Sequence, residues 1–282
     1  MKIQTDKYTV FSLELGDLLL DGGAVFGLIP KPLWQKKIAC DAENRIRLAM
    51  RALLVVGDGR VILIDTGAGI CLSEKICRLY GIDPGQNYLE QNLRAVGFTP
   101  ADVTDVVLTH LHFDHCGGAV VIMDGERRPA FPGARYYVQE SHFNWAMHPS
   151  VLDRASYVRE HFQMLEQAGL LQRLTGAQML FPGIEIIVSD GHVCGQQLVL
   201  IHDARRPVFF ACDLTPTAHH VTPTWITAFD LQPLMLVEEK QRLFERAHSE
   251  NWLIVFPHDP HIIAGQIAAG DKRIELQPEF FR

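Results

Sequence analysis

The chain has 282 residues, of which 48% are hydrophobic, and this content is sufficient for a substantial buried core. Its 33 acidic and 26 basic residues give a formal net charge of -7, and no run of Lys or Arg forms a face that could follow a phosphate backbone. Composition and charge therefore argue against a nucleic-acid partner.

The N-terminal segment carries no sustained apolar stretch, because Asp17 and Asp21 bracket the short run from Leu18 to Leu20. It predicts neither a signal peptide nor a membrane span. The six cysteines lack the regular spacing of a secreted disulfide scaffold, and none forms a C-x-x-C pair. We expect reduced thiols in a cytoplasmic protein that has no membrane partner.

The first half of the chain predicts a hairpin, two helices and a strand. Gly57-Asp58-Gly59 provides the hairpin turn, a polar turn at Asp65-Thr66-Gly67 follows it, and Gly97 ends the second helix. In chain order, the predicted elements are strands Leu53 to Val56 and Val61 to Ile64, helices Leu72 to Tyr80 and Tyr88 to Val96, and strand Asp105 to Leu108.

The second half predicts helices interrupted at Pro149, then strands, a helix and a last strand. Strands in both halves, with helices between and after them, are typical of an α/β layered fold whose two sheets pack together. No repeat or linker appears, which favours a single domain. The elements are strand Ala134 to Glu140, helices within Ser141 to Gly169, strands Ile184 to Val188, Leu198 to His202 and Val208 to Ala211, helix Val237 to Ser249, and strand Leu253 to Phe256.

A short loop after the strand at 105–108 gathers potential metal ligands: His110, His112, Asp114 and His115. Alternation places His110 and His112 on one side of an extended segment, and the chain then turns at Gly117-Gly118. Imidazoles and carboxylates are the ligands expected for zinc or a similar divalent ion. Unrelated histidines are the alternative, but so many strong ligands in six residues are rarely a packing solution.

Further potential ligands follow three other predicted strands. His192 comes after the strand at 184–188, Asp213 after the strand at 208–211, and His258 after the strand at 253–256. Loops at strand ends, positioned by a rigid scaffold, are where ligands are usually placed. We therefore expect these residues and the histidine loop to converge on one site.

The motif THLHFDH, preceded by LIDTG and followed by DGHVCGQ, CDL and FPHD, resembles the metallo-β-lactamase fold hydrolases from about Leu53 to Asp259. Within that superfamily, the motif order is most similar to the N-acyl homoserine lactonase-like, or quorum-quenching lactonase, branch. The resemblance implies a four-layer αββα sandwich. We expect this sandwich to form a single domain over residues 1–282, with an N-terminal extension at about 1–50.

The resemblance also implies two divalent metal ions per chain, zinc being expected and manganese or iron being alternatives. Asp213 would bridge the two ions, and Asp65 would orient the site without binding metal. His261 is a rival of His258 for the last ligand position, and the family motif favours His258. The implied ligands are His110, His112 and His192 for the first metal, and Asp114, His115 and His258 for the second.

A dinuclear site of this kind supplies hydroxide near neutral pH, which would attack an ester or lactone carbonyl. Asp114 would orient the water and relay a proton. The same site could act instead on a phosphoester or organophosphate. A diiron redox protein is disfavoured, since those relatives usually carry glutamate where this chain has His112, and the complete ligand set argues against a non-catalytic binding relative.

The substrate would be a small molecule, bound by a monomer or a homodimer. Homoserine lactonases carry a tyrosine shortly after the bridging aspartate, whereas this chain reads DLTPTAHH. Exposed-looking Phe26, Leu28 and Trp34 could form an apolar rim, or have a structural role in the outer layer. Other candidates for the substrate pocket are His219, His220 and Trp225, and the histidines expected at surface or half-buried helical positions are His142, His148, His161 and His248.

Overall fold

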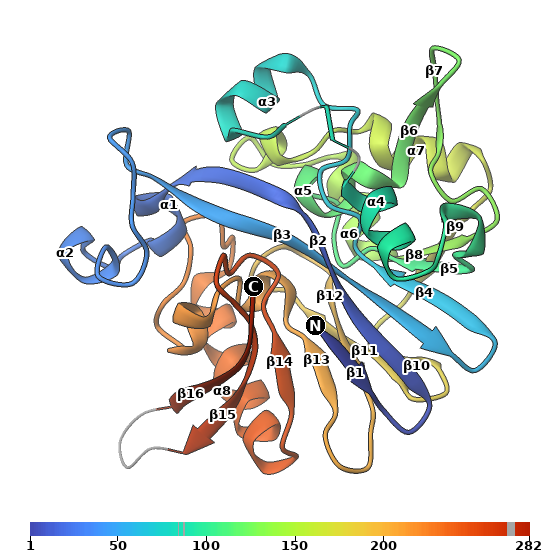
Figure 1. The fold of residues 1–282 in the computed structure, drawn as a ribbon. Coiled ribbons are helices and arrows are strands. Elements are labelled where there is room, and N and C mark those ends of the chain that lie inside the picture. Colours follow the sequence, from blue (N-terminus) through green and yellow to red (C-terminus); the bar gives the residue numbers. More distant parts are fainter. Residues whose placement is uncertain (84, 87, 270–273) are drawn as a thin grey trace. The chain divides into compact units, whose positions relative to one another are not determined.

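The computed structural model describes residues 1–83, 85–86, 88–269 and 274–282. The chain divides into two units, and each contains most of one seven-stranded sheet (Figure 1). Unit 1 comprises Met1–Gly16, Met50–Gly176 and Gly195–Gln197, and unit 2 comprises Asp17–Ala49, Ala177–Cys194 and Leu198–Arg282.

The first sheet has the strand order β1-β2-β3-β4-β5-β8-β9. Strands β3 and β4 form an antiparallel hairpin in which Leu53 lies opposite Ile64, whereas β4, β5 and β8 are parallel. The carboxyl ends of β4 and β5 therefore reach the same edge, where the Asp65 turn and the histidine loop begin. The strands are β1 (Lys2–Gln4), β2 (Tyr8–Asp21), β3 (Arg45–Gly57), β4 (Arg60–Ile64), β5 (Asp105–Val107), β8 (Arg135–Gln139) and β9 (Leu171–Leu174).

The second sheet runs in the order β10-β11-β12-β13-β14-β15-β16. Its strands β13 and β14 are parallel, so the chain leaves both at the same edge and continues to Asp213 and His258 respectively. The strands are β10 (Gln178–Phe181), β11 (Ile184–Ser189), β12 (Gln196–Ile201), β13 (Val208–Phe210), β14 (Leu253–Val255), β15 (Ile262–Ala269) and β16 (Ile274–Phe281).

The helices cover parts of these sheets. In unit 1, α6 packs on β8 and β9, and in unit 2, α8 packs on β15 (Figure 1). Among the described residues, no helix combines the length and apolar composition needed to cross a membrane. The helices are α1 (Gly22–Phe26), α2 (Lys31–Trp34), α3 (Glu74–Tyr80), α4 (Tyr88–Ala95), α5 (Phe113–Cys116), α6 (Glu140–Met147), α7 (Glu160–Gln167) and α8 (Pro233–Ser249), and a small hairpin is formed by β6 (Val120–Met123) and β7 (Glu126–Pro129).

Most of the predicted elements are confirmed with small shifts at their ends, and β3 begins earlier than predicted, at Arg45. The sequence interpretation missed β2 and the C-terminal hairpin of β15 and β16. Strand β2 contains Gly16 and β16 contains Pro278, and both residue types are depleted in strands. The single domain over 1–282 and its N-terminal extension stay predictions.

Candidate functional site

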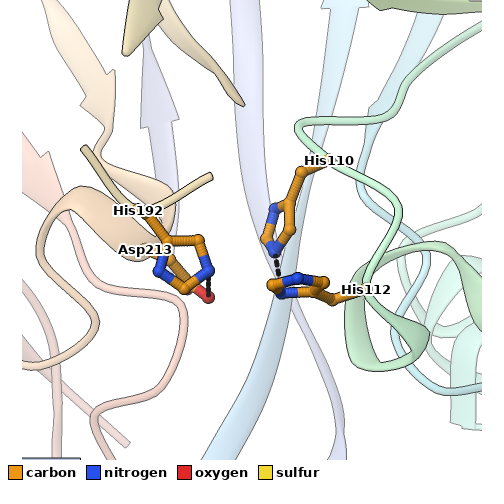
Figure 2. A group of neighbouring side chains, drawn as sticks. All are labelled: His110, His112, His192 and Asp213. Atoms are coloured by element: carbon orange, nitrogen blue, oxygen red, sulfur yellow. Dashed lines mark hydrogen bonds and ion pairs between the residues drawn. The ribbon is translucent and has the colours of Figure 1, made fainter. Parts of the chain in front are cut away.

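The histidine loop in unit 1 brings its four predicted ligands together. His110, His112 and His115 are all buried, and the ring centroids of His110 and His115 are 4.1 Å apart. The Nε2 atom of His110 lies 3.0 Å from the Nδ1 atom of His112, as Figure 2 shows for this pair. Asp114 is partly exposed, and its Oδ2 atom lies 3.8 Å from the Nε2 atom of His115. Imidazole nitrogens from neighbouring residues thus point toward one another.

Asp65 fixes the orientation of two of these rings. Its buried carboxylate accepts hydrogen bonds from the Thr109 backbone N–H, the Thr109 hydroxyl and the Nδ1 atom of His115, each at 2.8 Å. Because the Thr109 hydroxyl donates to Asp65, its oxygen accepts from the Nδ1 atom of His110, at 3.1 Å. Both rings therefore carry hydrogen on Nδ1 and a lone pair on Nε2. Asp65 thus holds the His115 ring directly and the His110 ring through Thr109, and its role in a metal site stays a prediction.

Two glycines allow the Asp65 turn to approach the histidine loop. A Cβ atom on Gly117 would lie 2.1 Å from the carbonyl oxygen of Ala68, and one on Gly118 would lie 2.2 Å from that of Thr66. Any larger residue would force the two backbones apart. The contact is completed by the Thr66 N–H, which donates to the His115 carbonyl at 2.8 Å.

Gln197, the residue after the motif DGHVCGQ, supports the start of the same loop. Its Nε2 atom donates to the carbonyl oxygens of Leu108, at 2.8 Å, and Tyr137, at 2.9 Å. Its backbone N–H donates to the Thr109 carbonyl at 2.8 Å. Our sequence interpretation assigned no role to this glutamine, which directly follows the motif DGHVCGQ.

Cys116 lies beside His115 in the same unit. It is fully buried, and its thiol donates to the Leu111 carbonyl at 3.3 Å. Burial raises the pKa of this thiol, so it favours the neutral form. The side chain fills space beside His115, and all six cysteines are free thiols.

Unit 2 brings the other three predicted ligands together around Asp213. The Nε2 atom of His192 lies 3.3 Å from one carboxylate oxygen of Asp213, and the Nε2 atom of His258 lies 3.1 Å from the other. Figure 2 draws the pair of His192 and Asp213. His261, the rival of His258, is exposed. Its backbone N–H donates to Asp259.

The two unit 2 histidines are also oriented through Nδ1. That atom of His192 donates to Asp230 at 2.8 Å, and that of His258 donates to the Ala49 carbonyl at 2.8 Å. Asp230 is buried and is held by the Thr227 N–H at 2.6 Å. Sequence analysis missed Asp230, because nothing in the surrounding TAFDLQP marks it as a partner of a histidine 38 residues away.

Two residues next to the predicted ligands have a left-handed backbone conformation, which non-glycine residues rarely adopt. Asp65 has φ 61°, and Cys212, which precedes Asp213, has φ 45°. Such conformations persist where the surrounding structure determines them, and they gather at functional sites.

The donor sets fit a divalent metal ion. In unit 2, two imidazoles with Nδ1 held by a protein partner present Nε2 to the Asp213 carboxylate. In unit 1, His115 presents Nε2 near Asp114, and His110 presents Nε2 to the His112 ring. Zinc, manganese and iron all accept this combination of nitrogen and oxygen donors. A hydrogen-bond partner on the second ring nitrogen is the usual environment of a metal-binding histidine.

Comparisons with known proteins agree with this chemistry. The family model described as the metallo-beta-lactamase superfamily matches residues 51–281. The chain belongs to this superfamily. An N-acyl homoserine lactonase from Agrobacterium fabrum is 30% identical over 195 residues, covering 66% of this chain and 69% of that protein.

Solved structures of similar fold include a probable metal-dependent hydrolase from Staphylococcus aureus. It is 27% identical, with a TM-score of 0.89, and the match covers 99% of this chain and 100% of that one. AidC, a dizinc quorum-quenching lactonase solved with a product, is 20% identical, with a TM-score of 0.78 over 100% of this chain and 98% of that one. These superfamily neighbours confirm the predicted α/β fold class, with sheets flanked by helices.

The expected apolar rim is wrong for two of its members. Phe26 and Trp34 are buried, at 0% and 1% exposure, whereas Leu28 is 90% exposed. The Phe26 ring stacks on Trp34 and on His220, with centroid distances of 5.4 and 5.0 Å, and it meets the edge of Trp225 at 5.8 Å. Local sequence could not reveal this stack, because His220 and Trp225 are distant in the chain.

His219 and Trp225 are more accessible than the stack and line a hollow of about 930 Å³ in unit 2. Apolar side chains such as Val221, Ile262 and Leu276 share its lining. His220 is fully buried, and its Nε2 atom donates to the Val25 carbonyl at 3.0 Å while its Nδ1 atom accepts from the Thr217 hydroxyl at 2.8 Å.

Proposed function

We propose that this superfamily member is a hydrolase that uses two divalent ions to open a lactone or a carboxylic ester. Asp213 would bridge the two ions. The observation that carries the proposal is the shared design of the two donor sets, in which buried histidines with fixed Nδ1 partners accompany a carboxylate. The first ion would be held by His110, His112 and His192, and the second by Asp114, His115 and His258.

The ions, when bound, would make hydroxide available near neutral pH and polarise the substrate carbonyl. Asp114 is suited to accept a proton from the attacking water, because its side chain is 15% exposed, whereas the neighbouring His115 side chain is 2% exposed. Its carboxylate would orient the attacking water, take its proton and return that proton to the leaving alkoxide. Asp65 keeps the His110 and His115 rings in position throughout.

The lactonase relatives and the hollow of unit 2 support a lactone or ester substrate. His219 could position the carbonyl in place of the tyrosine that is absent after Asp213. Burial lowers the pKa of His219, so its ring is neutral near pH 7 and can donate one hydrogen bond. The apolar part of its lining, with Trp225, would contact an acyl chain, while Lys37, Gln241 and Glu245 form the polar part.

We predict close to two divalent ions per chain when the protein is purified without chelator. His110→Ala should lower this number, because it removes a buried imidazole of the donor set, whereas His148→Ala should not, because His148 is exposed. Elemental analysis by mass spectrometry measures both. A number near zero, even after incubation with zinc or manganese, would contradict the dinuclear site.

We predict that kcat/KM rises with acyl-chain length across a series of lactones or esters. Each CH₂ that becomes buried contributes about 0.8 kcal/mol, which is about fourfold, until the hollow is filled. Trp225→Ala should flatten this dependence, because it removes part of the apolar lining. Steady-state kinetics with metal-loaded protein provide the measurement. If the enzyme ignores every carboxylic ester and lactone but cleaves a phosphotriester, the substrate class is wrong while the metal site stands.

A further inference from the structure

We propose that His142 is a positioning residue that holds the peptide segment between His110 and His112 in the geometry needed for metal binding. The inference rests on the proposed function, because it takes these two histidines as ligands. All of the residues that carry it lie in unit 1.

His142 lies in the first turn of α6 and is fully buried, contrary to the expectation of a surface or half-buried position. Its Nε2 atom accepts a hydrogen bond from the Leu111 backbone N–H, with a nitrogen–nitrogen distance of 2.8 Å. Its ring centroid lies 6.0 Å from that of His110. The imidazole thus reaches the one residue that separates the two proposed ligands.

The direction of this hydrogen bond defines the state of the ring. A backbone N–H is only a donor, so Nε2 of His142 has to offer its lone pair, and the hydrogen of the neutral ring is on Nδ1. His142 therefore acts as an acceptor toward the loop and is not itself placed as a ligand. An apolar residue at this position would leave the buried Leu111 N–H without this acceptor, at a cost of about 1–3 kcal/mol.

The surroundings fix His142 in turn. A Cβ atom on Gly195 would lie 2.4 Å from the Ser141 Oγ atom and 2.8 Å from the His142 backbone nitrogen, so only glycine permits this close approach to α6. The ring of Tyr157 lies 6.1 Å from that of His142 and 4.9 Å from that of His112. Gly195 comes from the motif DGHVCGQ, which gives this motif a second task beside supplying His192.

Two replacements separate the acceptor from the packing role. His142→Gln keeps an acceptor oxygen near the position of Nε2, whereas His142→Phe keeps a ring and removes the acceptor. His161→Phe is the matched control, because His161 is also fully buried in unit 1, on α7, and lies outside the histidine loop. Each variant is tested for zinc affinity by competition with a chromophoric chelator, and for thermal unfolding with and without zinc.

We expect His142→Phe to weaken zinc binding by about 10–100-fold, which is typical when an orienting partner of a metal site is lost. His142→Gln should recover most of this affinity, and His161→Phe should lower thermal stability without changing affinity. Equal zinc affinity in His142→Phe and the wild type would overturn the proposal. A loss that glutamine does not rescue at all, in a folded variant, would also overturn it.

Nitrogen NMR of the metal-free wild type tests the contact without any substitution. We expect His142 to be the Nδ1–H tautomer and the Leu111 amide to exchange slowly with solvent. The Nε2–H tautomer would overturn the inference even if the variants do not fold. If the tautomer is as expected but the wild type binds no zinc, the proposed metal function fails, and so does the role of His142 in it, while the hydrogen bond itself stands.

Discussion

Asp213→Ala is expected to abolish hydrolysis and to weaken metal binding by more than the approximately 10–100-fold that follows loss of an outer partner. Its carboxylate stands between the Nε2 atoms of His192 and His258, at 3.3 and 3.1 Å. Removing it takes away a carboxylate that contacts both imidazoles. Elemental analysis and zinc titration measure the loss of metal, and ester or lactone turnover measures the loss of activity.

The matched control is His261→Ala, which removes an exposed histidine from the same PHDPH segment. It should retain metal and activity, whereas His258→Ala should lose both. The opposite pattern, with metal lost from His261→Ala and kept in His258→Ala, would reverse the assignment of the last ligand. Asp213→Ala protein that keeps two ions and full turnover would remove the bridging role.

The proposed ligands could be predicted as a group because they lie in segments that leave the ends of strands. Strands β4 and β5 are parallel, as are β13 and β14, so the residues after each pair emerge at one edge. A short polar motif after an apolar run indicates the end of such a strand from the local sequence alone. The motifs LIDTG and THLHFDH therefore indicate the site even though the strands themselves are only three to five residues long.

The partners that orient the ligands were not predictable in the same way. Asp230 and the Ala49 carbonyl lie far in sequence from the histidines that they contact, and His142 lies far from Leu111. A backbone carbonyl carries no side-chain signal at all. Contacts between residues distant in the sequence also explain why the predicted exposure of Phe26 and Trp34 was wrong. Phe26 and Trp34 follow glycines and prolines that suggest a surface segment, yet tertiary packing against His220 buries them.

Lys240 lies behind this aromatic stack and provides a prediction about stability. Its side chain is 0% exposed, and its Nζ atom donates to the carbonyl oxygens of His220, at 3.1 Å, and Trp225, at 2.7 Å. Burial lowers the pKa of Lys240 from 10.5 to about 7, and the negative charge of Asp230 opposes this only in part. Burial also lowers the pKa of His220 to about 3, so this neighbour stays neutral above pH 6.

Between pH 7 and about 10.4, the unfolded chain therefore binds a proton at Lys240 that the folded chain does not. Stability consequently rises with pH in this window, by about 1.4 kcal/mol per pH unit from this group alone. Below pH 7 both states are protonated, so the contribution is constant and the cost of burying the charge is present in full.

Lys240→Met is expected to remove this slope. The unfolding free energy of the wild type minus that of Lys240→Met should rise by about 1.4 kcal/mol per pH unit from pH 7.5 to 9.5, and it should stay constant below pH 6. Urea unfolding of both proteins in the same buffers measures this difference. Lys75→Met, which removes an exposed amine on α3, should keep the wild-type profile. A parallel profile for Lys240→Met would mean that the Lys240 amine remains protonated in the folded chain, held by the carbonyls of His220 and Trp225.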